Sequence, residues 1–303
     1  MKEPVMHFDG PVWRPPYEAT SQLLQVTAGC TWHRCKFCTL YGKQRFRMSP
    51  MSEIESDLKV IHRFQPRAHR IFLTGANPFV LTVNRLTDIA LLIRKYVGEG
   101  LPTIGCFARI TDITKKSVDD LRQLHHLGFD FLTIGVESGD TDTLARVNKG
   151  YTAEDILEQC SKLDEAGIRY NFFYLVGLAG NGYGERNALR SAEIFNKLHP
   201  ISIGFLSLTL FPESQLYQEI VEGQYEEARE YERIDEMICL IEHLTCKTHI
   251  LARTVSNPIP FTGSLPTDRQ LLVDDLSSVK ERLSEEQLRS YRDSTEPLSL
   301  RFA

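Results

Sequence analysis

Strand-like and helix-like segments alternate along most of this chain, and this alternation restricts its fold more than any other feature. Apolar segments with strand character are separated by segments whose apolar residues recur at helical spacing. Such a pattern predicts an α/β fold built from parallel βαβ units, in which ligands bind at the carboxyl ends of the strands. We expect strands at residues 23–27, 70–74, 103–109, 131–137, 170–177 and 201–211, and helices near 50–64, 83–97, 117–127, 152–166 and 267–290.

Composition places the chain among ordinary globular proteins. Of its 303 residues, 42% are hydrophobic and 25% are charged, which suits one large core or two modest ones. The net charge of −5 gives no electrostatic case for wrapping duplex nucleic acid or coating an anionic membrane, although one local RNA contact remains compatible with it. No segment approaches the roughly 18 apolar residues of a membrane helix, and the amino-terminal segment lacks the order of a signal peptide. We therefore expect a cytoplasmic protein.

Three of the seven cysteines fall within nine residues, directly after the first expected strand. Cys30, Cys35 and Cys38 have the spacing C-x4-C-x2-C, whereas the other four cysteines are scattered. Three thiolates on a short loop can hold three corners of an iron–sulfur cluster, or three of the four positions around zinc. His33 lies inside the loop and is the candidate fourth ligand for zinc. Three unrelated core thiols fit poorly, because polar residues surround the cysteines.

Further motifs follow the cysteine loop in a fixed order. They are LTGANP (73–78), GVESGDTDTLARVNKG (135–150), LVGLAGNG (175–182) and LFPESQLY (210–217). With Phe37 before the last cysteine, these motifs resemble the radical S-adenosylmethionine (SAM) superfamily, in the subgroup of methylthiotransferases and oxygen-independent coproporphyrinogen oxidases. The resemblance covers about residues 20 to 217. Two departures are visible: the first cysteine gap is one residue longer than in the family, and the motif at residues 73–78 lacks the family's acidic residue.

The resemblance implies a fold and a chemistry. It implies a partial (βα)6 TIM-like barrel over residues 21–217, with a short amino-terminal arm (1–20) and a mainly helical carboxyl-terminal extension (218–303). The three cysteines would hold a [4Fe–4S] cluster whose fourth iron binds SAM. A flavodoxin- or ferredoxin-like partner would supply one electron, and the 5′-deoxyadenosyl radical formed would abstract hydrogen from a small organic substrate. Such a cluster is sensitive to oxygen.

The resemblance also suggests which residues contact SAM. Glu137, at an inward-facing position where a strand ends, would bind the ribose or the ammonium group; the alternative is a carboxylate facing solvent. Arg109 would bind a carboxylate of SAM or of the substrate, or else form an ion pair with Asp112 or with a helix residue. Lys149 would neutralise the SAM carboxylate, or else be a solvated surface lysine. The full set of expected SAM contacts is Phe37, Thr74, Gly75, Ala76, Asn77, Arg109, Glu137, Ser138, Lys149, Val176 and Gly177.

Catalytic residues are predicted less clearly than the residues that contact SAM. Arg109 and Cys106 are weak catalytic candidates, and Cys106 fits core packing better than hydrogen donation because its neighbours in the strand pattern are apolar. In the extension, Cys239, His243 and Cys246 recur at the spacing of one helical face, which suggests either a second metal site or an apolar core segment.

Two alternative functions remain open at this point. The same barrel could modify RNA or a peptide, or the chain could be a binding module stabilised by zinc or a cluster and without catalysis. The sequence contains no recognisable cobalamin-binding domain, RNA-binding β-barrel tail or cysteine-rich extension. Together with the mild net charge, this favours a small-molecule substrate over nucleic acid or a membrane. The loops that would determine specificity contain no motif from which the substrate can be identified.

Overall fold

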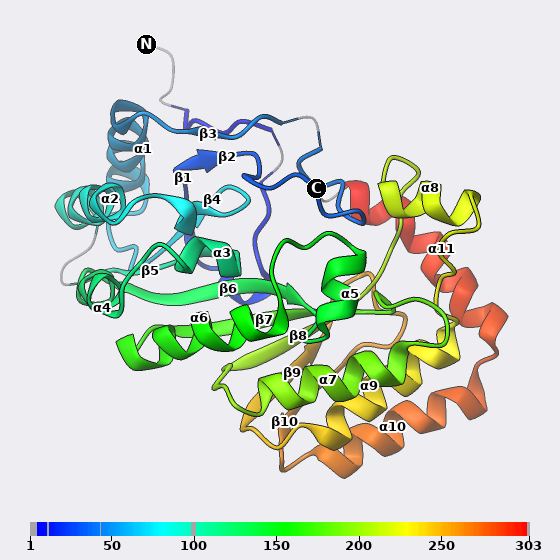
Figure 1. The fold of residues 1–303 in the computed structure, drawn as a ribbon. Helices are drawn as coiled ribbons and strands as arrows, with labels where there is room; N and C mark the ends of the chain where they lie inside the picture. Colours follow the sequence, from blue (N-terminus) through cyan, green and yellow to red (C-terminus); the bar gives the residue numbers. More distant parts are fainter. Residues whose placement is uncertain (1–4, 11, 43, 98–100, 302–303) are drawn as a thin grey trace. The chain divides into compact units, whose positions relative to one another are not determined.

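The computed structural model describes residues 5–10, 12–42, 44–97 and 101–301, with side chains described up to residue 294 (Figure 1). These residues form two compact units. The first unit comprises residues 1–33, 41–134 and 161–170, and the second comprises residues 34–40, 135–160 and 171–303. The outermost residues of the predicted arm and of the predicted extension, 1–4 and 302–303, lie outside the described residues.

The first unit has a four-stranded parallel sheet with the order β1-β4-β5-β6. Its strands are buried on both faces, as expected where helices cover a parallel sheet. Helix α1 packs against α2 and β1, and α2 packs against α4 (Figure 1). The main elements are β1 (Gln22–Gln25), α1 (Met51–Phe64), β4 (Arg70–Thr74), η2 (Pro78–Val80), α2 (Val83–Tyr96), β5 (Thr103–Ala108), α3 (Ile110–Ile113), α4 (Val118–His126) and β6 (Phe129–Glu137).

A small antiparallel hairpin follows β1 and was not expected from the sequence. It pairs β2 (Thr27–Ala28) with β3 (Arg47–Met48), and so brackets the cysteine loop between its two strands. The predicted arm contributes η1 (Pro16–Glu18). The buried Glu18 carboxylate is paired with Arg70, the first residue of β4. This part of the arm therefore contacts β4 at its amino end, whereas Asp9 of the arm is hydrogen-bonded to Gln25, the last residue of β1, and to Arg47 of β3.

The second unit continues with β7-β8-β9-β10. Strands β7, β8 and β9 are parallel, and β10 is antiparallel to β9. Helix α9 packs between α7 and α10 on this sheet (Figure 1). The elements are α5 (Thr141–Arg146), α6 (Ala153–Ala166), β7 (Arg169–Val176), α7 (Gly184–Phe195), β8 (Ser202–Ser207), α8 (Gln215–Val221), α9 (Glu230–His243), β9 (Thr248–Ala252), β10 (Phe261–Leu265), α10 (Arg269–Arg282) and α11 (Glu285–Arg301).

The predicted order of elements is found, with two differences in the extension. All six expected strands are present, and the last of them is shorter than its apolar run because it ends at Ser207. The single helix expected near residues 267–290 is two helices, α10 and α11, separated near Ser284. The extension also adds β9 and β10 to the sheet. Strand β9 begins with Thr248 and His249, and the centre of β10 is polar with a glycine at position 263. Neither strand therefore shows an apolar run like that of β4.

Candidate functional site

The residues singled out by the sequence follow the carboxyl ends of parallel strands in each unit. In the first unit, Cys30 lies in the loop after the β1 segment, Gly75 directly follows β4, and Arg109 directly follows β5. In the second unit, Glu137 ends β6 and Gly177 directly follows β7. In both units, the predicted residues therefore lie at the carboxyl ends of strands, where ligands bind in α/β folds.

The three clustered cysteines lie on a loop without helix or strand. All seven cysteines of the chain are thiols and none is in a disulfide; Cys30 and Cys35 are partly exposed and Cys38 is exposed. Cys30 belongs to the first unit, while Cys35 and Cys38 belong to the second. Among the described residues, no three metal-ligating side chains are already gathered into a metal site. The donor chemistry fits a cluster, and ligation by these cysteines stays a prediction.

In the first unit, the Asn77 side chain ties the cysteine loop to α3. Its Nδ2 donates to Thr31 Oγ1 at 2.8 Å and to Asp112 Oδ1 at 3.0 Å, and its Oδ1 accepts from Thr31 N at 3.3 Å. Asn77 is fully buried. The amide predicted to replace the family's carboxylate is thus hydrogen-bonded to a carboxylate, that of Asp112, which sequence reasoning considered only as a partner for Arg109.

The backbone of Arg109 is hydrogen-bonded to Asp112. Its N–H donates to Asp112 Oδ2 at 2.8 Å, and its guanidinium lies over the Trp32 ring at 4.9 Å from the ring centroid. Burial raises the pKa of Asp112 to about 6, against the lowering effect of the hydrogen bonds from Arg109 and Asn77. Burial also lowers the pKa of Lys116 to about 8, and its Nζ donates to the backbone oxygen of Asp112 at 2.9 Å.

Cys106 lies in the core of the first unit. Its side chain is fully buried, and burial raises the pKa of its thiol well above the ordinary value. In the sheet it stands beside Leu73 of β4 and Leu132 of β6. A buried thiol among aliphatic residues that resists ionisation supports the packing interpretation over a catalytic one.

The turn after β4 requires glycine. Gly75 has φ +126°, and a Cβ there would lie 2.0 Å from Thr27 Oγ1 and 2.6 Å from the Thr27 backbone oxygen. The same neighbourhood contains polar atoms without a protein partner: among the described residues, the hydroxyl groups of Thr27 and Thr74 are buried and accept or donate no hydrogen bond. Unsatisfied buried hydroxyls at a strand end are consistent with a ligand that would complete them.

In the second unit, Glu137 and Lys149 form a buried ion pair. Their Oε1 and Nζ atoms are 2.9 Å apart, and Nζ lies 5.7 Å from the ring centroid of Phe37 and 5.8 Å from that of Tyr151. Although burial alone would lower it, the Glu137 carboxylate, with Tyr151 and Cys35, raises the pKa of Lys149. Lys149 is only 5% exposed, so the alternative of a solvated surface lysine is wrong.

The second half of the cysteine loop is anchored by residues far away in the sequence. Lys36 N donates to the Val147 oxygen at 3.0 Å, and its backbone oxygen accepts from Leu216 N at 2.8 Å. Phe37 packs against a buried apolar cluster that includes Leu175 and Leu216. Lys36 Nζ lies 2.8 Å from Glu219 of α8. Sequence reasoning missed Glu219, because no local pattern links it to the loop.

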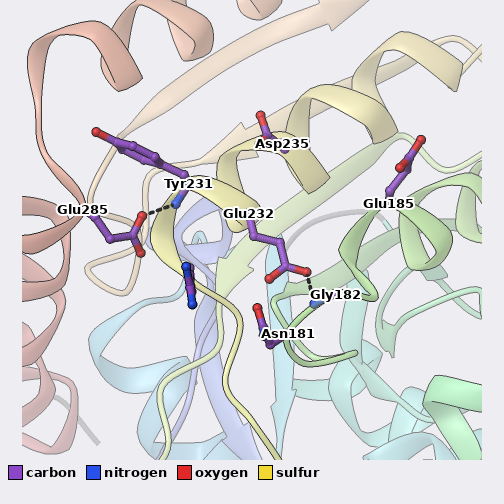
Figure 2. Close-up of a pocket in the computed structure, with 8 residues that line it drawn as sticks. Asn181, Gly182, Glu185, Tyr231, Glu232, Asp235 and Glu285 are labelled. Carbon is purple, nitrogen blue, oxygen red and sulfur yellow. Dashed lines mark hydrogen bonds between the residues drawn. The ribbon is translucent and has the colours of Figure 1, made fainter.

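One cavity in the second unit is lined by other residues (Figure 2). It has a volume of about 620 Å³ and none of the predicted site residues lines it. Two of its carboxylates bind backbone amides: Glu232 Oε1 accepts from Gly182 N at 2.6 Å, and Glu285 Oε2 accepts from Tyr231 N at 2.9 Å (Figure 2). These carboxylates satisfy backbone amides at the start of α7 and of α9.

The cysteines and histidine of the extension do not share one helical face. Cys239 and His243 lie in α9, with Sγ and Nδ1 3.8 Å apart, but α9 ends at His243 and Cys246 follows it. Cys246 therefore does not continue the helical face on which Cys239 and His243 lie. His243 Nδ1 is 2.8 Å from the Cys239 backbone oxygen.

Comparison with known proteins identifies related sequences and folds. The family model described as the radical SAM superfamily matches residues 24–192. An uncharacterized protein of Methanocaldococcus jannaschii is 23% identical over 57% of this chain and 53% of its own length. The tRNA-2-methylthio-N6-dimethylallyladenosine synthase of Bdellovibrio bacteriovorus is 24% identical over 52% of this chain and 35% of its own length. The chain thus spans about half or less of these curated relatives.

Two solved structures share its fold. Coproporphyrinogen III oxidase from Escherichia coli, described as a radical SAM enzyme, aligns with a TM-score of 0.56 and 14% identity over 86% of this chain and 58% of its own. The methyltransferase TsrM from Kitasatospora setae, solved with cobalamin and a [4Fe–4S] cluster, aligns with a TM-score of 0.54 and 18% identity over 67% of this chain and 39% of its own. The predicted fold class is confirmed by these likenesses. No described helix is long and apolar enough to cross a membrane.

Proposed function

The chain belongs to the radical SAM superfamily, and from this premise we propose that it cleaves SAM reductively at a [4Fe–4S] cluster and uses the radical formed to abstract hydrogen from a small organic substrate. With a cluster held by Cys30, Cys35 and Cys38, one-electron reduction of SAM would break the bond between sulfur and C5′ and give methionine and a 5′-deoxyadenosyl radical. Transfer of a hydrogen atom from the substrate would then give 5′-deoxyadenosine. The electron would come from a flavodoxin- or ferredoxin-like protein.

The observation that carries the proposal is the cysteine loop and its anchors. Cys30, Cys35 and Cys38 would supply three thiolate ligands and leave one iron for SAM. In the first unit, Thr31 is fixed to Asn77; in the second, Lys36 is fixed to Val147 and Glu219. Anchors on both halves of a loop that has no secondary structure of its own support a role in which the positions of its thiols matter.

Other residues would bind and orient SAM. The Lys149 ammonium, held by Glu137, would attract the SAM carboxylate. The unsatisfied hydroxyls of Thr27 and Thr74 would receive hydrogen-bonding partners when SAM lies against the turn at Gly75. Because an open iron site is readily oxidised, we expect the enzyme to be oxygen-sensitive and to work in a reducing, cytoplasmic environment.

A second candidate function keeps the same chemistry and changes the substrate. The relative from B. bacteriovorus is named for tRNA modification, which favours RNA as the alternative. The net charge of −5 favours a small molecule instead. Nucleic acid that copurifies with the protein and is released by salt would support RNA, and its absence together with turnover of a small molecule would support the leading proposal.

Metal and sulfide analysis tests the proposal against a zinc-stabilised module. After anaerobic reconstitution with iron and sulfide, the proposal predicts about four iron and four labile sulfide per chain and a broad absorption near about 400 nm. One zinc per chain without labile sulfide would support a binding module with His33 as the fourth ligand, and would contradict the proposal. His33 Nε2 already accepts a hydrogen bond from Cys30 N at 3.3 Å.

A further inference from the structure

Helix α9 binds the connection between β7 and α7 with three side chains from one helical turn. Glu232 Oε1 accepts from Gly182 N at 2.6 Å (Figure 2). It also accepts from Gly184 N at 3.3 Å. Arg233 Nη1 donates to the Val176 oxygen at 3.2 Å. Glu236 Oε2 accepts from Gly177 N at 2.7 Å. Both ends of this connection are therefore attached to a helix of the extension.

Glu236 is the most deeply placed of these side chains. Its carboxylate is fully buried, and its second oxygen accepts from Tyr174 OH at 2.6 Å and from Asn187 Nδ2 at 2.8 Å. Gly177, with φ +82°, passes so close to Arg233 that a Cβ would lie 2.7 Å from the guanidinium. A buried carboxylate is costly unless donors surround it, and here every partner that it has fixes the end of β7 or the start of α7.

The same carboxylate reaches the end of β6 through Asn187. Ser138 Oγ donates to Asn187 Oδ1 at 2.5 Å and accepts from Asp140 N at 2.9 Å. Ser138 and Asn187 are fully buried. A continuous hydrogen-bonded chain thus runs from Gly177 through Glu236 and Asn187 to Ser138. It joins two strand ends that the sequence separates by about forty residues.

We propose that Glu236 is a positioning residue for SAM, which sets the ends of β6 and β7 at the distance and orientation that the cofactor requires. The inference rests on the proposed function and on the sequence-based expectation that Ser138, Val176 and Gly177 contact SAM. Helix α9 lies outside residues 24–192, the part of the chain that matches the family model. The extension therefore completes the cofactor site from outside the region common to the family.

SAM affinity of the anaerobically reconstituted full chain, measured by isothermal titration calorimetry, tests this inference. Glu236→Ala and Asn187→Ala should each weaken SAM binding about tenfold, because each breaks the connection between the two strand ends. Glu232→Ala is the matched control: it removes a carboxylate one turn earlier in α9 that also binds backbone N–H groups of the β7–α7 connection. It should lower the melting temperature but change SAM affinity less than twofold.

Iron content and a conservative variant distinguish a loss of SAM positioning from a loss of the cluster. All variants should retain wild-type iron per chain, and Glu236→Gln, which keeps the size and one acceptor oxygen, should recover part of the affinity. Wild-type SAM affinity in folded Glu236→Ala, or an equal loss in Glu232→Ala, would overturn the inference. If wild-type protein itself binds no SAM, the proposed function fails; if it binds SAM and Glu236→Ala matches it, only the inference fails.

Discussion

The ammonium group of Lys36 lies 2.8 Å from Glu219 Oε1, and Arg146 Nη1 lies 2.5 Å from the other oxygen of the same carboxylate. Glu219 is 6% exposed. Burial alone would raise the pKa of Glu219. The hydrogen bonds from Lys36 and Arg146, together with their positive charges, lower it instead. One carboxylate on α8 thus connects the second half of the cysteine loop to α5, and all three segments belong to the second unit.

Removing this connection should loosen the cluster. In Glu219→Gln, the neutral side chain no longer balances Lys36 and Arg146, so the loop that carries Cys35 and Cys38 loses one of its anchors. We expect loss of iron to a chelator to be several-fold faster than in wild type, measured by the absorbance of the iron–chelator complex. Glu222→Gln, an exposed glutamate at the end of the same helix, should release iron at the wild-type rate. Equal rates in wild type and Glu219→Gln would contradict this role.

Breaking the ion pair of Glu137 and Lys149 should destabilise the protein. Lys149→Met leaves a carboxylate that is 15% exposed without its cation, and we expect a loss of about 2–4 kcal/mol in the free energy of unfolding. Glu137→Gln combined with Lys149→Met should recover part of that loss, since it removes the unpaired charge. Urea unfolding measures both, with Lys197→Met, at an exposed lysine, as the control. A single variant as stable as wild type would show that the pair contributes nothing.

The stability of the protein should carry a pH dependence due to Asp112. Its pKa is raised from 3.8 to about 6 by burial, so the folded protein holds this proton more tightly than the unfolded chain. The stabilisation is complete below about pH 4 and is lost as the pH rises through about 6, amounting to about 3 kcal/mol. Urea unfolding between pH 4 and 7 should show this component in wild type and in Asp119→Asn, an exposed carboxylate, but not in Asp112→Asn. An unchanged pH profile in Asp112→Asn would refute the assignment.

The seven cysteines should divide into three cluster ligands and four that are not. Alanine at Cys30, Cys35 or Cys38 should reduce iron from about four per chain to less than one after reconstitution, because two thiolates do not hold the cluster. Alanine at Cys239 or Cys246 should leave iron unchanged. Elemental analysis measures both sets, and loss of iron on changing Cys239 or Cys246 would place a ligand in the extension.

Local patterns were sufficient to predict the main elements of the barrel. The six strands and the helices between them were visible because apolar periodicity, capping residues such as Ser117 and stop residues such as Gly167 act over a few positions. The short strands β9 and β10 were missed because polar residues and, in β10, a glycine interrupt their apolar pattern. The break between α10 and α11 falls within a charged segment, where no glycine or proline marks it.

Only those residues of the candidate site that lie within a recognisable motif could be predicted. Phe37, Glu137 and Lys149 were expected as separate contacts, and the structure brings them together. Glu219 and Glu236 were not expected, because their partners lie far away in the sequence; Glu236 and Gly177 are 59 positions apart. One signal existed for Glu236: it occupies a buried position of α9 beside Met237, where an acidic residue is unusual and calls for a donor.

Product analysis after one-electron reduction tests the central claim most directly. Reconstituted protein is incubated without oxygen with SAM and dithionite, and 5′-deoxyadenosine is quantified by liquid chromatography and mass spectrometry, with Cys38→Ala as the control. We predict 5′-deoxyadenosine and methionine in equal amounts from wild type and none above background from Cys38→Ala. A wild-type protein that carries its full iron and sulfide, binds SAM and still forms no 5′-deoxyadenosine would contradict the claim.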